Sequence, residues 1–478
     1  MIAALHPQSR ADVDIAPHYG LFIDGDFVDP IDGASFKTIN PATEEVLASI
    51  SEAGAADVDR AVRAARSAYK ATWSRMPGAE RAKYLYRLAR IIQERSRELA
   101  VLETLDHGKP IRGSLDADVP LAAAHFFYNA GWADKLEHAG FGAKPRPCAV
   151  AAVIIPWNSP LLALAGKIAP ALATGNTVVL KPAETTPLTA LAFADICQQA
   201  ELPPGVVNIV TGGEQTGRLL VEHPDIDTIA FTGSTQMGES IQRAIGGTRK
   251  GLTLQLAGTV ANIVFDDAPI DEAVEAIVGG LLVNTGPVPF ADLRLVLQDS
   301  IHDDVLERLK DRLQTLHLGD PLDKSTDIGA INSAELHARI DEFVRSGDTE
   351  DAERWSAPCS IPDRGWWYPP TIFTGVAQAH RIAREEIFGP FLSILTFHAP
   401  NEAVEIANDS PYGLAAGVWT REGARALWTA SRLRAGTVWA NTFNVVDPAS
   451  PVGGFKESGF GREGGRQGLA AFLRTDVI

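Results

Sequence analysis

The sequence predicts an α/β protein in which parallel sheets are covered by helices. Helical and strand patterns alternate along most of the 478 residues, and no repeat of fixed period interrupts them. The composition, with 45% hydrophobic and 22% charged residues, is that of an ordinary globular protein. At about 150 residues per domain, the length suggests two to four domains. These observations argue against a disordered, collagen-like or membrane-spanning chain.

The first expected elements are a tail and a long helix. Residues 1–17 lack the basic start and apolar core of a signal peptide, so we expect a loose tail there. Over residues 79–105, apolar side chains recur at helical spacing, and Gly108 and Pro110 follow them. This pattern predicts one long amphipathic helix.

Strand and helix patterns alternate from residue 177 onward. Residues 177–180 are apolar and β-branched, and Thr186 and Pro187 offer an N-cap and a first-turn proline for a helix that reaches about residue 200. Residues 206–210 and 228–231 repeat the strand pattern, and each is followed by glycines and a helical stretch. Successive βα units of this kind predict a parallel sheet.

A second set of elements begins near residue 261. We expect a strand over residues 262–265, a helix over 271–282 and a strand over 294–297. These elements predict a second α/β domain.

Charge and cysteine content limit the partners and the compartment. The chain has 43 Lys and Arg against 60 Asp and Glu, and this net charge of −17 repels nucleic acid and anionic membranes. Cys148, Cys197 and Cys359 lie far apart without a C-x-x-C pair, so we expect neither a disulfide scaffold nor a metal site. A cytoplasmic location fits both observations.

Two segments have the character of a nucleotide-binding site. Residues 231–238, Phe-Thr-Gly-Ser-Thr-Gln-Met-Gly, follow a strand and open a helix, so N–H groups near Gly233 and Ser234 are available to a pyrophosphate. A glycine turn alone is more often only a tight βα turn. Upstream, Lys181 and Glu184 directly follow another buried strand and can bond to ribose hydroxyls. Because a carboxylate there repels a 2′-phosphate, NAD is favoured over NADP.

Seven motifs follow one another between about residue 19 and residue 472. They are Asn40-Pro41-Ala42-Thr43, Ala130-Gly131-Trp132-Ala133-Asp134-Lys135, Pro156-Trp157-Asn158-Ser159-Pro160-Leu161, Lys181 to Glu184, Phe231 to Thr235, Glu386-Ile387-Phe388-Gly389-Pro390, and Gly453 to Gly459 leading to Gly461-Arg462-Glu463. In these motifs, and in their order and spacing, the sequence resembles the NAD(P)-dependent aldehyde dehydrogenase superfamily.

The resemblance implies an aldehyde dehydrogenase-like fold, with a Rossmann-type cofactor domain, and NAD as the cofactor. It implies that Lys181 and Glu184 hold the adenosine ribose. The pyrophosphate then lies on the helix that opens at residue 234, and Glu386 holds the nicotinamide ribose. The cofactor residues that it implies are Ile154, Pro156, Trp157, Lys181, Glu184, Gly213, Gly217, Phe231, Gly233, Ser234, Glu386 and Phe388.

The residues that carry the family's chemistry differ in this chain. The family uses a cysteine nucleophile, an oxyanion hole formed by an asparagine and the cysteine N–H, and a glutamate general base. Residues 284–289 match its Asn-x-Gly-Gln-x-Cys segment, and Pro289 stands at the nucleophile position without a thiol or an N–H. Gln255 stands at the general-base position, and Asn158 remains as one oxyanion donor.

These substitutions should each slow aldehyde oxidation strongly. Loss of one oxyanion donor costs about 10²–10³, and loss of a general base costs about 10²–10⁴. A shifted alignment is disfavoured, because no cysteine lies between Cys197 and Cys359. Lys167 and Glu463 match the outer residues of the family's proton relay, but with Gln255 between them we expect a structural ion pair.

The domain boundaries and the assembly follow from the resemblance. It implies an NAD-binding domain of residues 1–137 and 148–257 and a catalytic-type domain of residues 258–457. Residues 138–147 and 470–478 match the family's oligomerisation element but are shorter than usual. We therefore expect a homodimer or a hetero-oligomer rather than a tetramer.

Three functions remain open. The first is an NAD-binding pseudoenzyme or partner subunit that cannot oxidise aldehydes through a thiohemiacetal. The second is an NAD-dependent oxidoreductase that transfers a hydride directly to or from an aldehyde, alcohol, imine or alkene. The third is a structural partner of an active aldehyde dehydrogenase, in which the cofactor only stabilises the fold.

Overall fold

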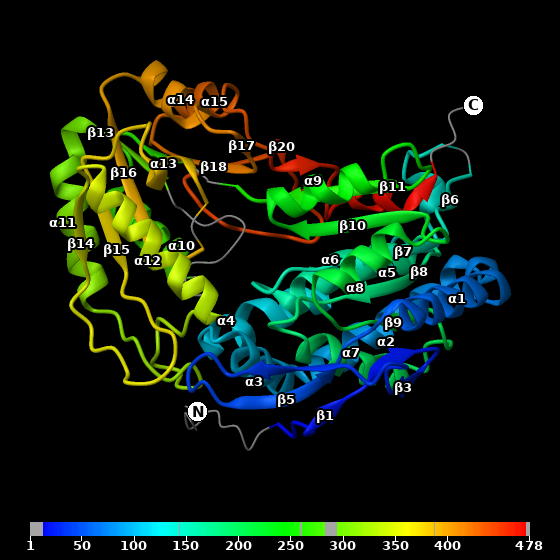
Figure 1. Ribbon diagram of the computed structural model, residues 1–478. Coiled ribbons are helices and arrows are strands. Elements are labelled where there is room, and N and C mark those ends of the chain that lie inside the picture. The colour runs from blue at the N-terminus through cyan, green and yellow to red at the C-terminus, as the bar shows by residue number, and fades with distance from the viewer. Residues whose placement is uncertain (1–12, 143, 259–260, 283–293, 387, 475–478) are drawn as a thin grey trace, which may run out of the picture.

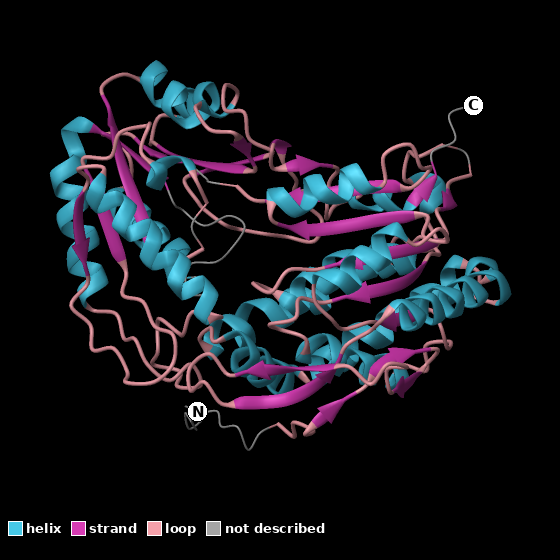
Figure 2. Cartoon of the chain, in the orientation of Figure 1, coloured by secondary structure: helices cyan, strands magenta, loops and turns pink. Residues whose placement is uncertain are grey.

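The computed structural model contains two large sheets that lie side by side, each with helices on both faces (Figure 1). The structure describes residues 13–142, 144–258, 261–282, 294–386 and 388–474. The predicted α/β fold class is confirmed. Helices enclose the sheets, and the small sheets lie toward the outside (Figure 2).

The first large sheet has eight strands, and its five central strands are parallel. The three outer strands run antiparallel to their neighbours. In spatial order the strands are β21 (Gly459–Phe460), β11 (Gly251–Leu256), β10 (Thr228–Gly233), β7 (Val150–Ile154), β8 (Thr177–Lys181), β9 (Val207–Ile209), β2 (Leu21–Ile23) and β3 (Asp26–Val28).

Both faces of this sheet are buried, as the apolar strands require. Along β7, Ala151 and Val153 join one core cluster, while Val150, Ala152 and Ile154 join the cluster on the opposite face. The helices of the first core are α2 (Gly78–Glu94), α3 (Ser96–His107), α5 (Val119–Ala130), α6 (Pro160–Ala173) and α7 (Leu188–Gln199), with the short α4 (Ile111–Gly113) beside them. The helices of the second core are α1 (Ala55–Ala71), α8 (Glu214–Glu222) and α9 (Thr235–Ala244).

The second large sheet has seven strands and is parallel except for its edge strand β14. In spatial order the strands are β14 (Glu353–Ser356), β15 (Thr371–Thr374), β16 (Phe391–Phe397), β13 (Arg294–Gln298), β12 (Ala261–Val264), β18 (Ala415–Trp419) and β19 (Thr437–Ala440). The accompanying helices are α10 (Ile270–Leu282), α11 (His302–Gln314), α12 (Ala334–Thr349), α13 (Arg381–Arg384), α14 (Pro400–Asn408) and α15 (Gly423–Ala430).

Three small sheets complete the described fold. They are β1 (His18–Tyr19), β5 (Val46–Ser51) and β4 (Ser35–Ile39); β17 (Tyr412–Gly413) with β20 (Phe455–Lys456); and β22 (Leu473–Arg474) with β6 (Arg146–Pro147). The last pair joins the two segments for which the sequence predicts a reduced oligomerisation element. Its role in assembly stays a prediction.

The predicted βα units of both sheets are confirmed, with ends that shift by one to two residues. The single helix predicted over residues 79–105 is wrong, because the chain turns at Arg95 between α2 and α3. The physical reason is burial: α2 buries one stripe against the core, whereas every α3 residue from Leu99 to His107 is buried, so α3 must enter the interior.

The predicted N-cap of α7 is also wrong. The residue before the helix is Pro187, and the Thr186 hydroxyl lies toward the Trp157 carbonyl, at 3.4 Å. The N–H of Leu188 instead donates to Oδ2 of Asp106, at 2.8 Å. A buried carboxylate from α3 therefore satisfies the helix start that a local side chain was expected to cap.

Candidate cofactor and active site

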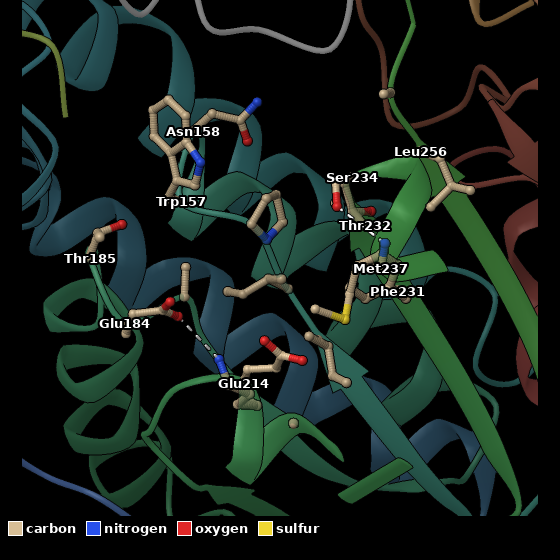
Figure 3. Close-up of a pocket in the computed structure, with 18 of the residues that line it drawn as sticks. Trp157, Asn158, Glu184, Thr185, Glu214, Phe231, Thr232, Ser234, Met237 and Leu256 are labelled. Atoms are coloured by element: carbon tan, nitrogen blue, oxygen red, sulfur yellow. Dashed lines mark hydrogen bonds and ion pairs between the residues drawn. The ribbon is translucent and has the colours of Figure 1, made fainter. Parts of the chain in front are cut away.

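A pocket of about 880 Å³ lies at the carboxyl ends of the parallel strands of the first sheet, where open α/β sheets bind ligands (Figure 3). The structure brings most of the predicted site residues together there. Those that line the pocket are Ile154, Pro156, Trp157, Asn158, Lys181, Glu184, Gly217, Phe231, Gly233, Ser234, Gln255, Glu386 and Phe388. The predicted cofactor residue Gly213 does not line the pocket. It lies just before α8, as the N-cap of that helix.

One end of the pocket carries a lysine and a carboxylate. Lys181 is the last residue of β8, and its side chain is only 7% exposed. Its Nζ lies 3.6 Å from Oε2 of Glu184, whose side chain is 54% exposed, and donates to the Pro182 carbonyl at 2.8 Å. Burial lowers the pKa of Lys181, while Glu184 acts to raise it. The pair therefore presents both a donor and an accessible acceptor to hydroxyl groups.

The N-terminus of α9 opens onto the middle of the pocket. Ser234 is its N-cap, and the Ser234 hydroxyl accepts from the Met237 N–H at 3.3 Å. A Cβ added at Gly233 would lie 2.5 Å from the ring of Phe231, so any larger residue there would displace this ring. The other N–H groups of the first helical turn and the helix dipole suit a bound pyrophosphate.

Aromatic rings and a buried carboxyl group form the other end. The Trp157 ring lies 5.9 Å from the Phe388 ring and 5.5 Å from the buried His107 ring. Glu386 accepts from the Gly258 N–H at 3.0 Å, and burial raises its pKa to about 8. Asn158 is 5% exposed and lines the same region. The Trp157 and Phe388 rings meet edge to face, at 72°, and the polar groups of Asn158 and Glu386 lie in the same region of the pocket.

Gln255 belongs to a polar network behind the pocket. Lys167 pairs with Glu463, as expected, and its Nζ also donates to the Thr232 hydroxyl at 2.6 Å. With its amide nitrogen turned toward Glu463, Gln255 donates to Oε1 at 3.0 Å and to Oε2 at 2.7 Å. The Gln255 amide thus joins the network as a donor, and it offers no group there that could take up a proton.

The predicted nucleophile position, Pro289, lies outside the described residues. The three cysteines do not line the pocket. Burial raises the pKa of the Cys148 thiol to about 11 and raises that of Cys197 further. Cys359 lies in a loop beside β14 and is partly buried, which also raises its pKa. All three thiols are thus mainly protonated at neutral pH.

The sequence analysis missed several residues that line the pocket. Asn332 and Ser333 directly precede α12, and Glu335, Leu336 and Arg339 lie in its first two turns; this helix packs with the second sheet. The helix start could be recognised, because Ser333 caps it by accepting from the Leu336 N–H at 3.1 Å. The position of α12 against the first sheet is set by tertiary packing, so the local sequence does not indicate it.

The described part of the chain shows neither a membrane-spanning helix nor a cluster of metal ligands. None of the helices there is long and apolar enough to cross a lipid bilayer. Over the same residues, no three His, Cys, Asp or Glu side chains are grouped so that they could hold a metal ion.

Comparison with known proteins identifies the family. The family model described as aldehyde dehydrogenase family matches residues 27–478. Aldehyde dehydrogenase family 2 member B4, mitochondrial, of Arabidopsis thaliana is 42% identical over 472 residues, which are 96% of this chain and 88% of that protein. The mitochondrial aldehyde dehydrogenase of Rattus norvegicus is 41% identical over 470 residues, 96% and 91% of the two chains.

Solved structures of aldehyde dehydrogenases also superpose closely on this chain. The NAD⁺ complex of an aldehyde dehydrogenase from Bacillus cereus superposes with a TM-score of 0.92 at 40% identity and covers 96% of this chain and 95% of that one. The P. syringae indole-3-acetaldehyde dehydrogenase AldA, in complex with NAD⁺ and IAA, gives a TM-score of 0.92 at 38% identity and covers 96% of each chain. NAD as the expected cofactor is consistent with both complexes.

Proposed function

Because the chain belongs to the aldehyde dehydrogenase family, we propose that it binds NAD in this pocket but does not oxidise aldehydes through a covalent thiohemiacetal. NAD fits the residues present. Lys181 and Glu184 would hold the adenosine ribose, and the N-terminus of α9 would hold the pyrophosphate. Glu386 would bond to the nicotinamide ribose beside the Trp157 and Phe388 rings. When bound, NAD would supply a hydride acceptor.

The observation that carries the second half of the proposal is the environment of Gln255. The general base of the family would have to take a proton from water at this position. Here an amide donates both of its hydrogen bonds to Glu463, which is also paired with Lys167. An amide has no basic lone pair at neutral pH, and its donors are already engaged. The position therefore holds a structural contact instead of a base.

The composition of the nucleophile segment supports the same conclusion. Residues 283–293 contain no cysteine, and Pro289 supplies neither sulfur nor an N–H. Cys148 and Cys197 are buried away from the pocket, and Cys359 is in a loop beside the second sheet. A substitute nucleophile would need a thiolate close to Asn158, and these three thiols do not provide one.

The test restores the missing groups. Wild-type protein should bind NAD, seen as quenching of tryptophan fluorescence, and should not reduce NAD with acetaldehyde. The variant Pro289→Cys, Gln255→Glu should reduce NAD with acetaldehyde at least 100-fold above the wild-type background, because it regains a covalent path and a base. Cys359→Ser is the matched control and should change neither property. Oxidation of acetaldehyde by the wild type at a turnover of about 1 s⁻¹ or more would contradict the proposal.

A second candidate is direct hydride transfer, and the intact nicotinamide end of the pocket favours it. Asn158, Glu386 and Phe388 all line this end, and an amide can polarise a carbonyl or orient an alcohol without covalent capture. A screen of aldehydes, alcohols, imines and alkenes at the NADH absorbance band would test it. Activity that falls at least tenfold in Asn158→Ala, with NAD binding retained, would support this candidate over the first.

We further propose the domain boundaries, assembly and location expected from the sequence. The NAD-binding domain would comprise residues 1–137 and 148–257, and the catalytic-type domain residues 258–457. The short β6–β22 pair is consistent with a reduced oligomerisation element and with a homodimer, or with a hetero-oligomer that includes an active relative. We place the protein in the cytoplasm. A stable homotetramer in a solution mass measurement would contradict the assembly, and isolation without any relative would contradict the hetero-oligomer.

A further inference from the structure

The buried end of helix α3 supports the turn that carries Trp157 and Asn158. The Glu103 side chain is fully buried, and its Oε2 accepts from the Leu161 N–H at 3.3 Å. This N–H lies in the first turn of α6, where backbone donors need partners from outside the helix. Glu103 is itself fixed by an ion pair with the buried Lys109. A side chain of α3 therefore anchors the end of this turn.

His107, the last residue of α3, contacts the same turn through its ring. The ring is fully buried, and its centroid lies 5.5 Å from that of the Trp157 ring, at an interplanar angle of 33°. On the pocket side, the Phe388 ring packs against Trp157 with 5.9 Å between centroids. Trp157 and Phe388 line the pocket and His107 does not. His107 thus supports the Trp157 ring from the protein interior.

Hydrogen bonding does not explain the position of the His107 ring. Neither ring nitrogen forms a hydrogen bond of ordinary geometry within the described residues. Burial, and then the charge of Lys109, lower the pKa of His107 well below its usual value, while the nearby Asn158 backbone acts to raise it. The ring is therefore neutral, and its unpaired polar atoms destabilise the fold. The favourable contact that it makes is with Trp157.

The backbone of His107 reaches the second wall of the pocket. Its carbonyl accepts from Nδ2 of Asn332 at 3.2 Å, and Asn332 lines the pocket just before α12. The carbonyl of the next residue, Gly108, accepts from the Ala330 N–H at 2.8 Å. The end of α3 is therefore fixed between two pocket walls that come from different sheets, and this fixes the base on which Trp157 rests.

We propose that His107 is a positioning residue for the nicotinamide end of the pocket, where its ring holds Trp157 in the orientation that the cofactor needs. This inference rests on the proposed binding of NAD. Because rings pack on Trp157 from both sides before a ligand binds, little of its motion remains to be lost on binding. Without the His107 ring, Trp157 would turn into the space left behind it. The adenosine end, at Lys181 and Glu184, would keep its geometry.

The experiment measures dissociation constants of NAD and ADP-ribose by calorimetric titration of the wild type and three variants. ADP-ribose lacks the nicotinamide group, so it reports on the adenosine and pyrophosphate part of the pocket alone. His107→Ala should weaken NAD binding about tenfold and ADP-ribose binding less than about twofold, because only the nicotinamide end loses support. His107→Val, which fills more of the space without a flat ring, should shift the ratio of the two constants in the same direction. His107→Phe keeps a flat ring and should bind NAD within about threefold of the wild type.

His125→Ala is the matched control, because His125 is also a buried histidine whose pKa is lowered by burial, to about 4, and it does not line the pocket. It should leave the ratio of the two constants unchanged.

A merely structural role of His107 would weaken both ligands by the same factor. That result in His107→Ala and His107→Val, or an unchanged ratio, would overturn the inference while NAD binding stands. A ratio that is shifted as far in His107→Phe as in His107→Ala would also overturn it, since the ring would then not be the supporting group. If the wild type binds no NAD, the proposed function fails together with the inference, and this is seen before any substitution is made.

Discussion

Replacing Glu386 by glutamine should remove a pH dependence of folding stability. The side chain is buried, accepts from the Gly258 N–H at 3.0 Å, and has a pKa raised to about 8, chiefly because burial disfavours its charged form. In the unfolded chain its pKa is near 4.5. Between these two values the folded state holds a proton that the unfolded state has released. Stability contributed by the protonated group is therefore full below the unfolded pKa and is lost as the pH rises through 8.

The magnitude follows from these two pKa values. Proton uptake by the folded state contributes roughly 2.1 kcal/mol at pH 6.5 and roughly 0.4 kcal/mol at pH 8. The free energy of unfolding should thus fall by about 1.7 kcal/mol over this interval because of Glu386 alone. Glutamine keeps the acceptor for Gly258 and does not titrate, so the variant should lack this fall. Asp106, whose burial raises its pKa to about 7, titrates in both proteins and cancels in the comparison.

Urea unfolding followed by tryptophan fluorescence at pH 6.5 and pH 8 is the assay. With a denaturant slope of about 3 kcal/mol/M, the wild-type midpoint should fall about 0.6 M further than the Glu386→Gln midpoint. Equal changes in the two midpoints, at equal slopes, would show that Glu386 is ionised in the folded protein throughout and would refute the reasoning.

Other predictions concern the turn, the buried ion pairs and the thiols. Gly233→Ala should weaken NAD binding at least tenfold in calorimetric titration, because its Cβ would lie 2.5 Å from the Phe231 ring; unchanged affinity would contradict the steric argument. Lys109→Met should destabilise the fold by about 3–5 kcal/mol in urea, because it strands two buried carboxylates; adding Glu103→Leu should recover part of the loss. In native protein at pH 8, a thiol reagent should modify Cys359 first; prior reaction of a buried thiol would contradict the burial seen here.

The secondary structure near the parallel strands was predictable because each strand is buried on both faces. Such strands are short apolar runs, and β8 and β10 appear in the sequence in this way. Prediction failed where a distant residue decides the local structure. The start of α7 is capped by Asp106, 82 positions away, and the break at Arg95 follows from the burial of α3 on all sides. Neither of these causes leaves a pattern in the nearby sequence.

The same distinction holds in the pocket. Its first wall follows strands β7, β8 and β10, so motifs at strand ends were enough to predict Trp157, Lys181 and Ser234 as neighbours. The second wall comes from α12, and Arg339 could be placed there only by the packing of the two large sheets. The role of Gln255 as a donor to Glu463 likewise depends on a contact between residues 208 positions apart.

The residues of the pocket divide into those that the fold requires and those that it does not. Gly238 would place a Cβ 2.5 Å from Leu256, and Gly233 is held by a similar contact, so both glycines are needed for packing whether or not a ligand binds. Glu184 is different, because it is 54% exposed, and an ion pair as exposed as the one it forms adds little stability. Its carboxylate is explained by a ligand and not by folding. Glu184 therefore indicates a cofactor more directly than the glycine turn does, and Glu184→Gln should change ligand choice while leaving the free energy of unfolding in urea within about 0.5 kcal/mol of the wild-type value.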